Sequence, residues 1–498
     1  MNSVHVMLKI KLLFWLLIFV QVSQINAQPG NLSLNFKTSA GYITPGRIPF
    51  WLRSNQFGSI PHDKFSLSLI SSLHKDYDRK NKGIFDWGGA IEGRLNLGES
   101  STFYLIEGYG KFKISVFELK AGRSREVMGL CDTSLSSGSF SVSGNSLGIP
   151  KVQLAIPEFY SIPLFDKLFA FKGNFAHGWI GETIVEKLND SITPINTFLH
   201  QKSFYGRFGK PFWKWKLYGG FNHQSFWGNE NIYYGSHYTL SALQSYFYII
   251  TGKPYGTRNI PMSKIGNHLG SIDFGFEYNF SNVGILVYRQ NFYDIGALYY
   301  LANIRDGLNG ISLVNNRVSN KGFQWKKILF EFFYSKNQAG ELWSPITPSG
   351  DENYYNNDQY LEGWSYKGTG IGNPFISPQA ETRVGLPSYP RNFFINNRIL
   401  LLHLGYMGSI QNWDFTSRLS YSMNYGTFAT SSIGHSLGKI RFPPRYGIFK
   451  EARQFSAFLE GNKNLNESFK IGFSTGLDLG KLYYNSWGFM VNLSKSFN

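Results

Sequence analysis

The sequence predicts an all-β fold, a closed antiparallel transmembrane β-barrel of about sixteen to eighteen strands, with eighteen favoured. Three observations predict it: segments that alternate between apolar and polar residues, an amphipathic final strand that ends in phenylalanine, and turns that are short at one end of the strands and long at the other. The composition agrees, because 17% of the residues are aromatic and only 16% are charged, whereas proteins on average contain about 25% charged residues. A soluble enzyme is therefore disfavoured.

The N-terminal segment is typical of a cleaved signal peptide. Lys9 and Lys11 precede the apolar run Leu12–Val20, and a polar stretch leads to the expected cut between Ala27 and Gln28. An uncleaved anchor helix is the alternative, but a membrane-spanning helix needs about 20 apolar residues and this run is shorter. The chain is therefore expected to be exported and built into a bacterial outer membrane.

The mature chain, residues 28–498 after loss of the signal peptide 1–27, is predicted to be a single barrel with elaborated loops. Removal of the two leader lysines lowers its formal charge from +17 to +15. This charge suits an anionic polymer or the phosphates of outer-membrane lipopolysaccharide, or it merely reflects basic residues in periplasmic turns. Nucleic acid is not an expected partner. The one cysteine, Cys131, excludes an internal disulfide and a multi-cysteine metal cluster.

Residues 413–425 show the alternation most clearly. Successive strand side chains point to opposite faces, so the apolar residues share one face and the polar residues the other. The segments 272–280 and 469–479 repeat the pattern. A soluble β-sandwich also alternates, but 498 residues would be unusual for one sandwich. The side chains expected to meet lipid in the first segment are Trp413, Phe415, Leu419 and Tyr421.

The final strand, residues 487–497, places Trp487, Val491 and Leu493 on one face and ends at Phe497. Such an end resembles the sorting signal of outer-membrane barrels, so the barrel-assembly machinery is an expected partner during biogenesis. Pairing of this strand would close the sheet and so remove exposed strand edges, whose backbone N–H and C=O groups cannot form hydrogen bonds with lipid.

Sixteen strands can be placed by the alternation, and an even count of eighteen requires two more between Leu32 and Phe57. The sixteen lie near residues 65–74, 84–97, 102–121, 150–157, 168–176, 203–209, 213–222, 271–280, 283–292, 311–316, 323–336, 396–408, 413–425, 453–461, 468–479 and 486–497.

The lengths of the connections predict the orientation. With the C-terminus in the periplasm, the periplasmic turns are mostly short and the extracellular loops mostly long, as in bacterial barrels. The short turns are 98–101, 210–212, 281–282, 317–322, 409–412 and 462–467, and the long loops are 124–149, 177–202, 223–270, 337–395 and 426–452.

One short helix is compatible with the loop sequence between Thr239, the expected N-cap, and Gly252, the expected stop. It would plug the lumen or lie over its mouth. The aromatic and β-branched residues of this segment also suit a strand. The face expected to be apolar consists of Leu240, Leu243, Phe247 and Ile250.

Several motifs resemble a known family. They are PFWLRSNQFGSIP at 49–61, the block 119–163, FKGNFAHGW at 171–179, HQSFWGNE at 223–230, YRQNFYD at 288–294, RDGLNGISL at 305–313 and GWSYKGTGIGNPF at 363–375. Together they look like the Wzi capsule-assembly family, in the version common among Bacteroidetes. The resemblance spans nearly the whole mature chain, and the block 119–163 is its most specific part.

The resemblance implies an eighteen-stranded barrel that helps to hold capsular polysaccharide at the cell surface and acts as a lectin without catalysis. On the predicted topology, three of the motifs fall at extracellular strand ends, where aromatic rings can stack on sugars and polar groups can bond hydroxyls. The candidate stacking residues are Trp227, Tyr293 and Trp364, and the candidate polar contacts are His223, Asn229, Glu230, Arg289 and Asp294. For any one of them, bracing of the barrel rim is the favoured alternative.

Signals for catalysis are weak, and no catalytic residue, metal or cofactor is predicted. GNSLG at 144–148 matches a nucleophile elbow literally, but the strand-to-helix context that this elbow needs is missing. The glycines at 368, 370 and 372 lack the context of a phosphate loop. The acids at 351, 352 and 358 lack the spacing of a calcium loop. A diffusion porin for anionic solutes is the alternative function, and a barrel-embedded hydrolase is a more distant one.

Overall fold

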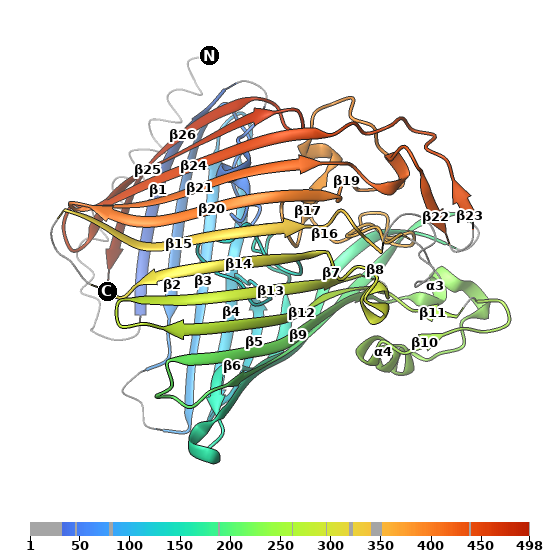
Figure 1. Ribbon diagram of the computed structural model, residues 1–498, viewed down its shortest axis with the longest axis horizontal. Coiled ribbons are helices and arrows are strands. Elements are labelled where there is room, and N and C mark those ends of the chain that lie inside the picture. The colour runs from blue at the N-terminus through green and yellow to red at the C-terminus, as the bar shows by residue number, and fades with distance from the viewer. Residues whose placement is uncertain are drawn as a thin grey trace.

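The computed structural model describes residues 32–44, 47–78, 83–187, 190–260, 262–294, 296–317, 322–339, 351–437 and 440–497. Within them, eighteen antiparallel strands form one closed barrel (Figure 1). The last barrel strand pairs with the first from Leu34 opposite Phe497 to Ile43 opposite Gly488, which closes the sheet. The predicted fold class is confirmed. The predicted signal peptide, 1–27, lies outside the described residues.

The barrel strands, each paired with its neighbours in chain order, are β1 (Leu32–Ile43), β2 (Phe65–Lys75), β3 (Phe85–Leu97), β4 (Thr102–Ile114), β5 (Phe117–Arg123), β6 (Lys151–Ser161), β7 (Phe169–Glu186), β8 (Ile192–Phe208), β9 (Trp215–Trp227), β12 (Asn267–Asn279), β13 (Val283–Tyr293), β14 (Gly307–Asn315), β15 (Phe323–Tyr334), β20 (Ile399–Ile410), β21 (Trp413–Asn424), β24 (Ala452–Asn464), β25 (Phe469–Gly480) and β26 (Ser486–Phe497).

The loops hold the short elements. The α-helices are α2 (Phe50–Arg53), α3 (Glu230–Tyr234) and α4 (Ala242–Thr251), and the 3-10 turns are η2 (Phe165–Lys167), η3 (Gly235–His237), η4 (Ala297–Tyr300), η5 (Gln379–Glu381) and η6 (Phe428–Thr430). Four small hairpins are formed by β10 (Pro254–Tyr255) with β11 (Ser263–Lys264), β16 (Ser365–Tyr366) with β17 (Thr369–Gly370), β18 (Ser377–Pro378) with β19 (Phe394–Asn396), and β22 (His435–Leu437) with β23 (Ile440–Phe442). None of the helices in the described part of the chain is long and apolar enough to cross a membrane.

The strands alternate as predicted. On β21, Leu419 and Tyr421 are 40% and 37% exposed on the outer face. Ser420, between them, points into the barrel, where it accepts a hydrogen bond from the indole of Trp51. The apolar face of the barrel therefore faces outward, where lipid lies.

Two predicted strand positions are wrong. Among the described residues between Leu32 and Phe57, 32–44 and 47–57, β1 is the one strand, because the chain then forms helix α2. The eighteenth strand comes instead from the predicted strand 102–121, which is the hairpin β4–β5. Ser115 makes its tight turn with a φ of 57°, and no glycine or asparagine marks that position in the sequence.

The long loops predicted at 124–149, 223–270, 337–395 and 426–452 lie close to their predicted positions. The long loop predicted at 177–202 is wrong, because β7 continues to Glu186 and β8 begins at Ile192, so only a short turn connects these two strands. Described parts of the loops 223–270 and 337–395 lie at the end of the barrel opposite the C-terminus (Figure 1). The turn 98–101 was expected at the C-terminal end, and that expectation is wrong. Because 102–121 is a hairpin, this turn lies at the long-loop end, which we call the outer end.

The predicted loop helix is present as α4, but its cap and its position differ. Ser241, not Thr239, is the N-cap, and its hydroxyl and the Gln244 side chain form a capping box. Gly252 ends the helix in the left-handed conformation, as expected. The residues buried on α4 are Ser245 and Ile249. The helix does not plug the lumen; it packs beside the outer face of the wall.

Candidate functional site

Three loop segments fold inward and fill the lumen; we call residues 48–60, 124–149 and 353–378 the plug. Their apolar side chains form one buried cluster with inward-facing strand residues. Helix α2 lies in the plug, with Phe50, Trp51 and Leu52 buried. The lumen of this barrel is thus built as a packed core.

Hydrogen bonds attach the plug to strands around the whole wall. They join the backbone N–H of Leu130 to Asp273 of β12 (2.8 Å), that of Ser137 to Glu331 of β15 (2.6 Å), that of Phe50 to Asp478 of β25 (2.7 Å), and the indole of Trp51 to Ser420 of β21 (3.1 Å). Arg125 forms an ion pair with Glu92 of β3. Because these strands lie on different sides of the barrel, the plug spans the lumen.

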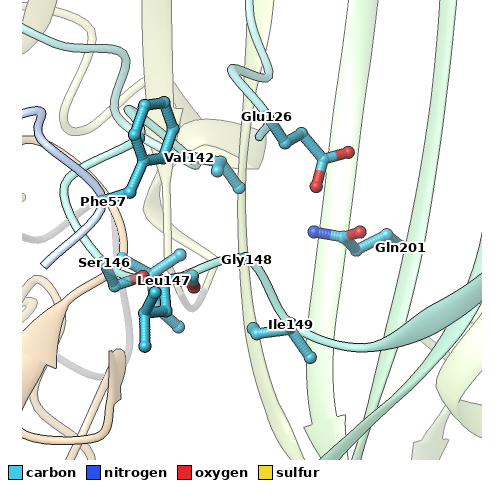
Figure 2. A pocket seen from close by; sticks show the side chains of 10 residues that line it. Phe57, Glu126, Val142, Ser146, Leu147, Gly148, Ile149 and Gln201 are labelled. Carbon is cyan, nitrogen blue, oxygen red and sulfur yellow. Dashed lines mark hydrogen bonds between the residues drawn. The ribbon is translucent and has the colours of Figure 1, made fainter. Parts of the chain in front are cut away.

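A small cavity remains between the plug and β8. Its volume is about 20 Å³, which suits one ordered water more than a sugar. Figure 2 shows Phe57 and Ser146 on one side of it and Glu126 and Gln201 on the other. Ser146, the serine of GNSLG, lies in a plug loop and donates its hydroxyl hydrogen to the Leu147 carbonyl (3.2 Å). This geometry is not that of a nucleophile elbow.

A second cavity, of about 30 Å³, opens at the outer end. We call it the mouth pocket. Three separate segments meet there: the chain after β1, the loop near η5, and the turn between β25 and β26. The polar and aromatic side chains that line it are Arg47, Arg53, His62, Glu381, Asp478, Tyr483 and Tyr484.

The mouth pocket contains two arginines and two acidic side chains. Arg53 forms an ion pair with Glu381, and its guanidinium lies 5.6 Å from the centroids of both Phe50 and Tyr483. Burial lowers the pKa of Arg53, but Glu381, Tyr483 and Asp478 together raise it more, so the net pKa is above the usual value. Burial and the nearby Arg53 lower the pKa of His62.

Arg47 is the more accessible cation of the pocket. Its side chain is exposed and donates a hydrogen bond to the Ala380 carbonyl (3.0 Å). A guanidinium offers five N–H donors in a planar fork that matches a carboxylate. Tyr484 lines the same pocket.

Four of the sequence-predicted site residues lie on the outer face of the wall, and hydrogen bonds brace two of them, Arg289 and Tyr293. The Arg289 guanidinium donates to Asn291 (2.7 Å), Asn309 (2.6 Å) and the Ile304 carbonyl (2.5 Å). The Tyr293 hydroxyl donates to the Asn222 carbonyl (2.8 Å).

The other two of these four are buried. His223 Nε2 lies 2.9 Å from His268 Nδ1. Trp227 is 8% exposed and packs against Tyr246 of α4 at a centroid distance of 5.0 Å. Neither side chain offers an open surface to a sugar ring.

The remaining four predicted residues lie in the outer loops or the plug. Asn229 donates to the Asn196 carbonyl (2.8 Å). Glu230 and Asp294 are buried, and burial raises the pKa of both carboxyls. Trp364 is fully buried in the plug and stacks on Phe226 at 4.3 Å.

The structure therefore brings together only part of the predicted set. His223 and Tyr293 are near neighbours, with parallel rings 6.4 Å apart. Trp364 and Trp227 lie on opposite faces of the wall, because Trp364 stacks on the inward Phe226 that precedes Trp227. The mouth-pocket residues were missed, although Arg53 lies inside the motif PFWLRSNQFGSIP, and Arg47 lies just before it.

One group of metal-ligating side chains occurs among the described residues. The ligand atoms of His74, Glu92 and Glu107 lie within 4.8 Å of one another in the lumen. Arg125 already forms an ion pair with Glu92 and donates its backbone N–H to Glu107 (3.0 Å). The cationic side chain of Arg125 thus already neutralises Glu92 in this group.

The chain is similar to known outer-membrane barrels. The sequence model of the family described as capsule assembly protein Wzi matches residues 52–396. No curated protein sequence matches the chain.

Among solved structures, the chain is similar to Escherichia coli Wzi, described as an outer-membrane protein involved in Group 1 capsule assembly and a carbohydrate-binding β-barrel. The two share 12% identity over 96% of this chain and 86% of that one, with a TM-score of 0.52. Acinetobacter baumannii OccAB2 shares 11% identity over 94% and 98% of the two chains, with a TM-score of 0.45. Pseudomonas aeruginosa OprD shares 11% identity over 94% and 95%, with a TM-score of 0.44. The protein is thus an outer-membrane β-barrel, and since the family match extends over more than half of its residues, it belongs to the capsule assembly protein Wzi family.

Proposed function

We propose that this barrel holds capsular or related extracellular polysaccharide at the cell surface, as a lectin and without catalysis. The observation that carries the proposal is the plug: hydrogen bonds to strands on several sides make the barrel a rigid support whose outer end carries the mouth pocket. Membership of the capsule assembly family and the likeness to a carbohydrate-binding barrel support the same function.

The mouth pocket supports a contact with an acidic or hydroxyl-rich polymer. The pocket is too small to enclose a sugar ring, so the contact we propose is with groups that project from a chain lying across the outer end. Arg47 would pair with a carboxylate or donate to hydroxyls, and Tyr484 would supply an aromatic surface.

The eight residues predicted from the sequence enter this proposal mainly as supports. The Arg289 guanidinium, the Tyr293 hydroxyl and Nε2 of His223 bond neighbouring residues, and Trp227 and Trp364 are buried. Contacts of this kind favour bracing of the outer end over direct contact with a ligand. Lipopolysaccharide and the barrel-assembly machinery are further partners that we predict for this protein.

The test is polysaccharide retention in a gene-deletion strain. Loss of the protein should leave polysaccharide in the medium that wild-type cells keep bound, and the wild-type gene should restore retention. Arg47→Gln should weaken binding of the isolated polysaccharide about tenfold or more, because a hydrogen bond to a charged group contributes roughly 1.5–3 kcal/mol.

The matched control is Arg445→Gln, which changes an exposed arginine of another outer loop. Both variants must show the heat-modifiable gel migration of a folded barrel. Equal retention in the deletion strain and the wild type would refute the proposed function. If retention is lost in the deletion strain but is normal in Arg47→Gln, the mouth pocket has no part in the proposed function.

A further inference from the structure

The loop between β9 and β12, residues 228–266, folds back beside the outer face of the barrel; we call it the outer flap. Tyr246 of α4 contacts the rings of His200 and Trp227, with centroids 5.8 and 5.0 Å apart. The Lys202 ammonium donates to the Ile250 carbonyl of the same helix. Figure 1 shows α4 beside the outer ends of β9 and β12.

These contacts lie on the outside of the wall. On β8, Gln201 points inward, where it accepts a hydrogen bond from Lys151 (2.6 Å) and bonds Gln224 of β9 (2.6 Å). His200 and Lys202, its two neighbours, must then point outward. The flap therefore covers wall surface that would otherwise face the surroundings of the barrel.

The flap begins where the lipid-facing band ends. Phe204 of β8 pairs with Phe221 of β9, which pairs with Ile272 of β12, and all three are exposed on the outer face. The next outward residues toward the outer end are His223 and Lys202, and Lys202 donates to the Ile250 carbonyl of the flap. Two residues of a strand span roughly 7 Å, so α4 lies at the edge of the apolar band.

The flap presents an apolar surface of its own. Ser245 and Ile249 are the buried residues of α4, and Ile249 packs with Trp227 in a small cluster separate from the plug. Leu243 and Phe247, one turn apart on another side of the helix, are 67% and 59% exposed. A helix in water seldom leaves two large apolar residues of one face this exposed.

The composition of the flap matches the boundary between lipid and water. Residues 228–266 contain six tyrosines, and tyrosine is enriched at membrane interfaces. Lys253, Arg258 and Lys264 are exposed, whereas Glu230, the flap's one acid in the sequence, is buried. An exposed surface with positive charge and no exposed acid suits anionic lipid headgroups.

We propose that the outer flap is a membrane-interface element of the outer leaflet. In this arrangement Leu243 and Phe247 contact lipid acyl chains at the edge of the apolar band, and Lys253, Arg258 and Lys264 lie among headgroup phosphates. The occupant of the exposed face of α4 is membrane lipid, continuous with the lipid around the barrel. The flap would fix the height and tilt of the barrel in the leaflet.

The test places nitroxide labels on α4 in the full-length protein. Leu243→Cys and Phe247→Cys are made in a Cys131→Ala background, labelled, and reconstituted into vesicles of phosphatidylethanolamine and phosphatidylglycerol. Oxygen concentrates in the bilayer and a nickel chelate stays in water, so the ratio of the two collision rates reports depth. Both labels should collide more with oxygen, whereas a label at Val384→Cys, which replaces an exposed apolar residue of another loop, should collide more with nickel.

Two results would overturn the proposal. Labels at 243 and 247 that prefer nickel, as at 384, would place the flap in water. Labels shielded from both reagents would show that a protein partner or a second copy covers the face. Photocrosslinking of the unmodified protein with a diazirine-bearing phospholipid checks the result without substitutions: the peptide that contains α4 should carry the lipid adduct, and an unlabelled α4 beside labelled strand peptides would refute the assignment.

Discussion

The indole N–H of Trp364 donates a hydrogen bond to the carbonyl oxygen of Ser141 (3.1 Å). These residues lie in different plug segments, so the bond joins two loops that enter the lumen from distant parts of the sequence. The Trp364 ring also stacks on Phe226 of β9, which connects both loops to the wall. One side chain thus holds together three of the parts that fill the barrel.

Trp364→Ala should loosen the plug. Truncation of a buried tryptophan costs about 3–5 kcal/mol and leaves a cavity. We expect the wild-type protein to show little conductance in planar bilayers and the variant to show channel openings. The control is Trp87→Ala, which removes a half-exposed tryptophan of the outer face. This variant should show as little conductance as the wild type. Large, stable channels in the wild type would favour a diffusion porin instead.

Much of the wall could be predicted from the sequence, because alternation is a local property. The segment that became β21 shows its lipid face in the residue order alone, and the final strand shows its apolar face and its closing phenylalanine. The turn at Ser115 could not be predicted, since a serine with positive φ leaves no mark in the sequence. The prediction therefore merged β4 and β5 into one strand.

The site was harder to predict than the wall. Residue type and position near a strand end pointed to Trp227 and Trp364, but the burial of both depends on where long loops fold. Trp364 is buried by plug segments and strands remote in the sequence, and Trp227 by a flap that returns to the outside of the wall. Such long-range packing leaves no periodic pattern, so the mouth pocket and the burial of the predicted residues emerged only with the structure.

Surface proteolysis should reveal the orientation. The outer flap and the loop 425–451 lie at the end opposite the C-terminus, and the turn 465–468 lies at the other end. If the C-terminus is periplasmic, protease added to intact cells should cut the first two segments and spare the turn. Cells with a permeabilised outer membrane control for protection by folding. Cleavage of intact cells in the short turns alone would reverse the topology.

Glu331→Ala should destabilise the barrel. The buried Glu331 carboxylate accepts hydrogen bonds from the Ser136 hydroxyl (2.7 Å), the Ser137 backbone (2.6 Å) and the Tyr288 hydroxyl (2.5 Å). Each buried donor left without a partner costs about 1–3 kcal/mol, so the temperature of heat-modifiable gel migration should fall clearly. Asp414→Ala, at an exposed ion pair with Lys326, should change it little. Equal shifts in the two variants would argue against the plug as a source of stability.

Trp227→Ala separates bracing of the flap from contact with polysaccharide. The indole packs against Tyr246, Phe198 and the ring of His177, and its N–H has no hydrogen-bond partner among the residues that the structure describes. Its loss removes packing alone, so α4 should come away from the wall while the barrel stays folded. We expect faster protease cleavage within 228–266, unchanged polysaccharide retention and unchanged heat-modifiable migration. A variant with normal flap protection and shed polysaccharide would instead identify Trp227 as a sugar contact, and loss of the barrel itself would show that the bracing extends to the wall.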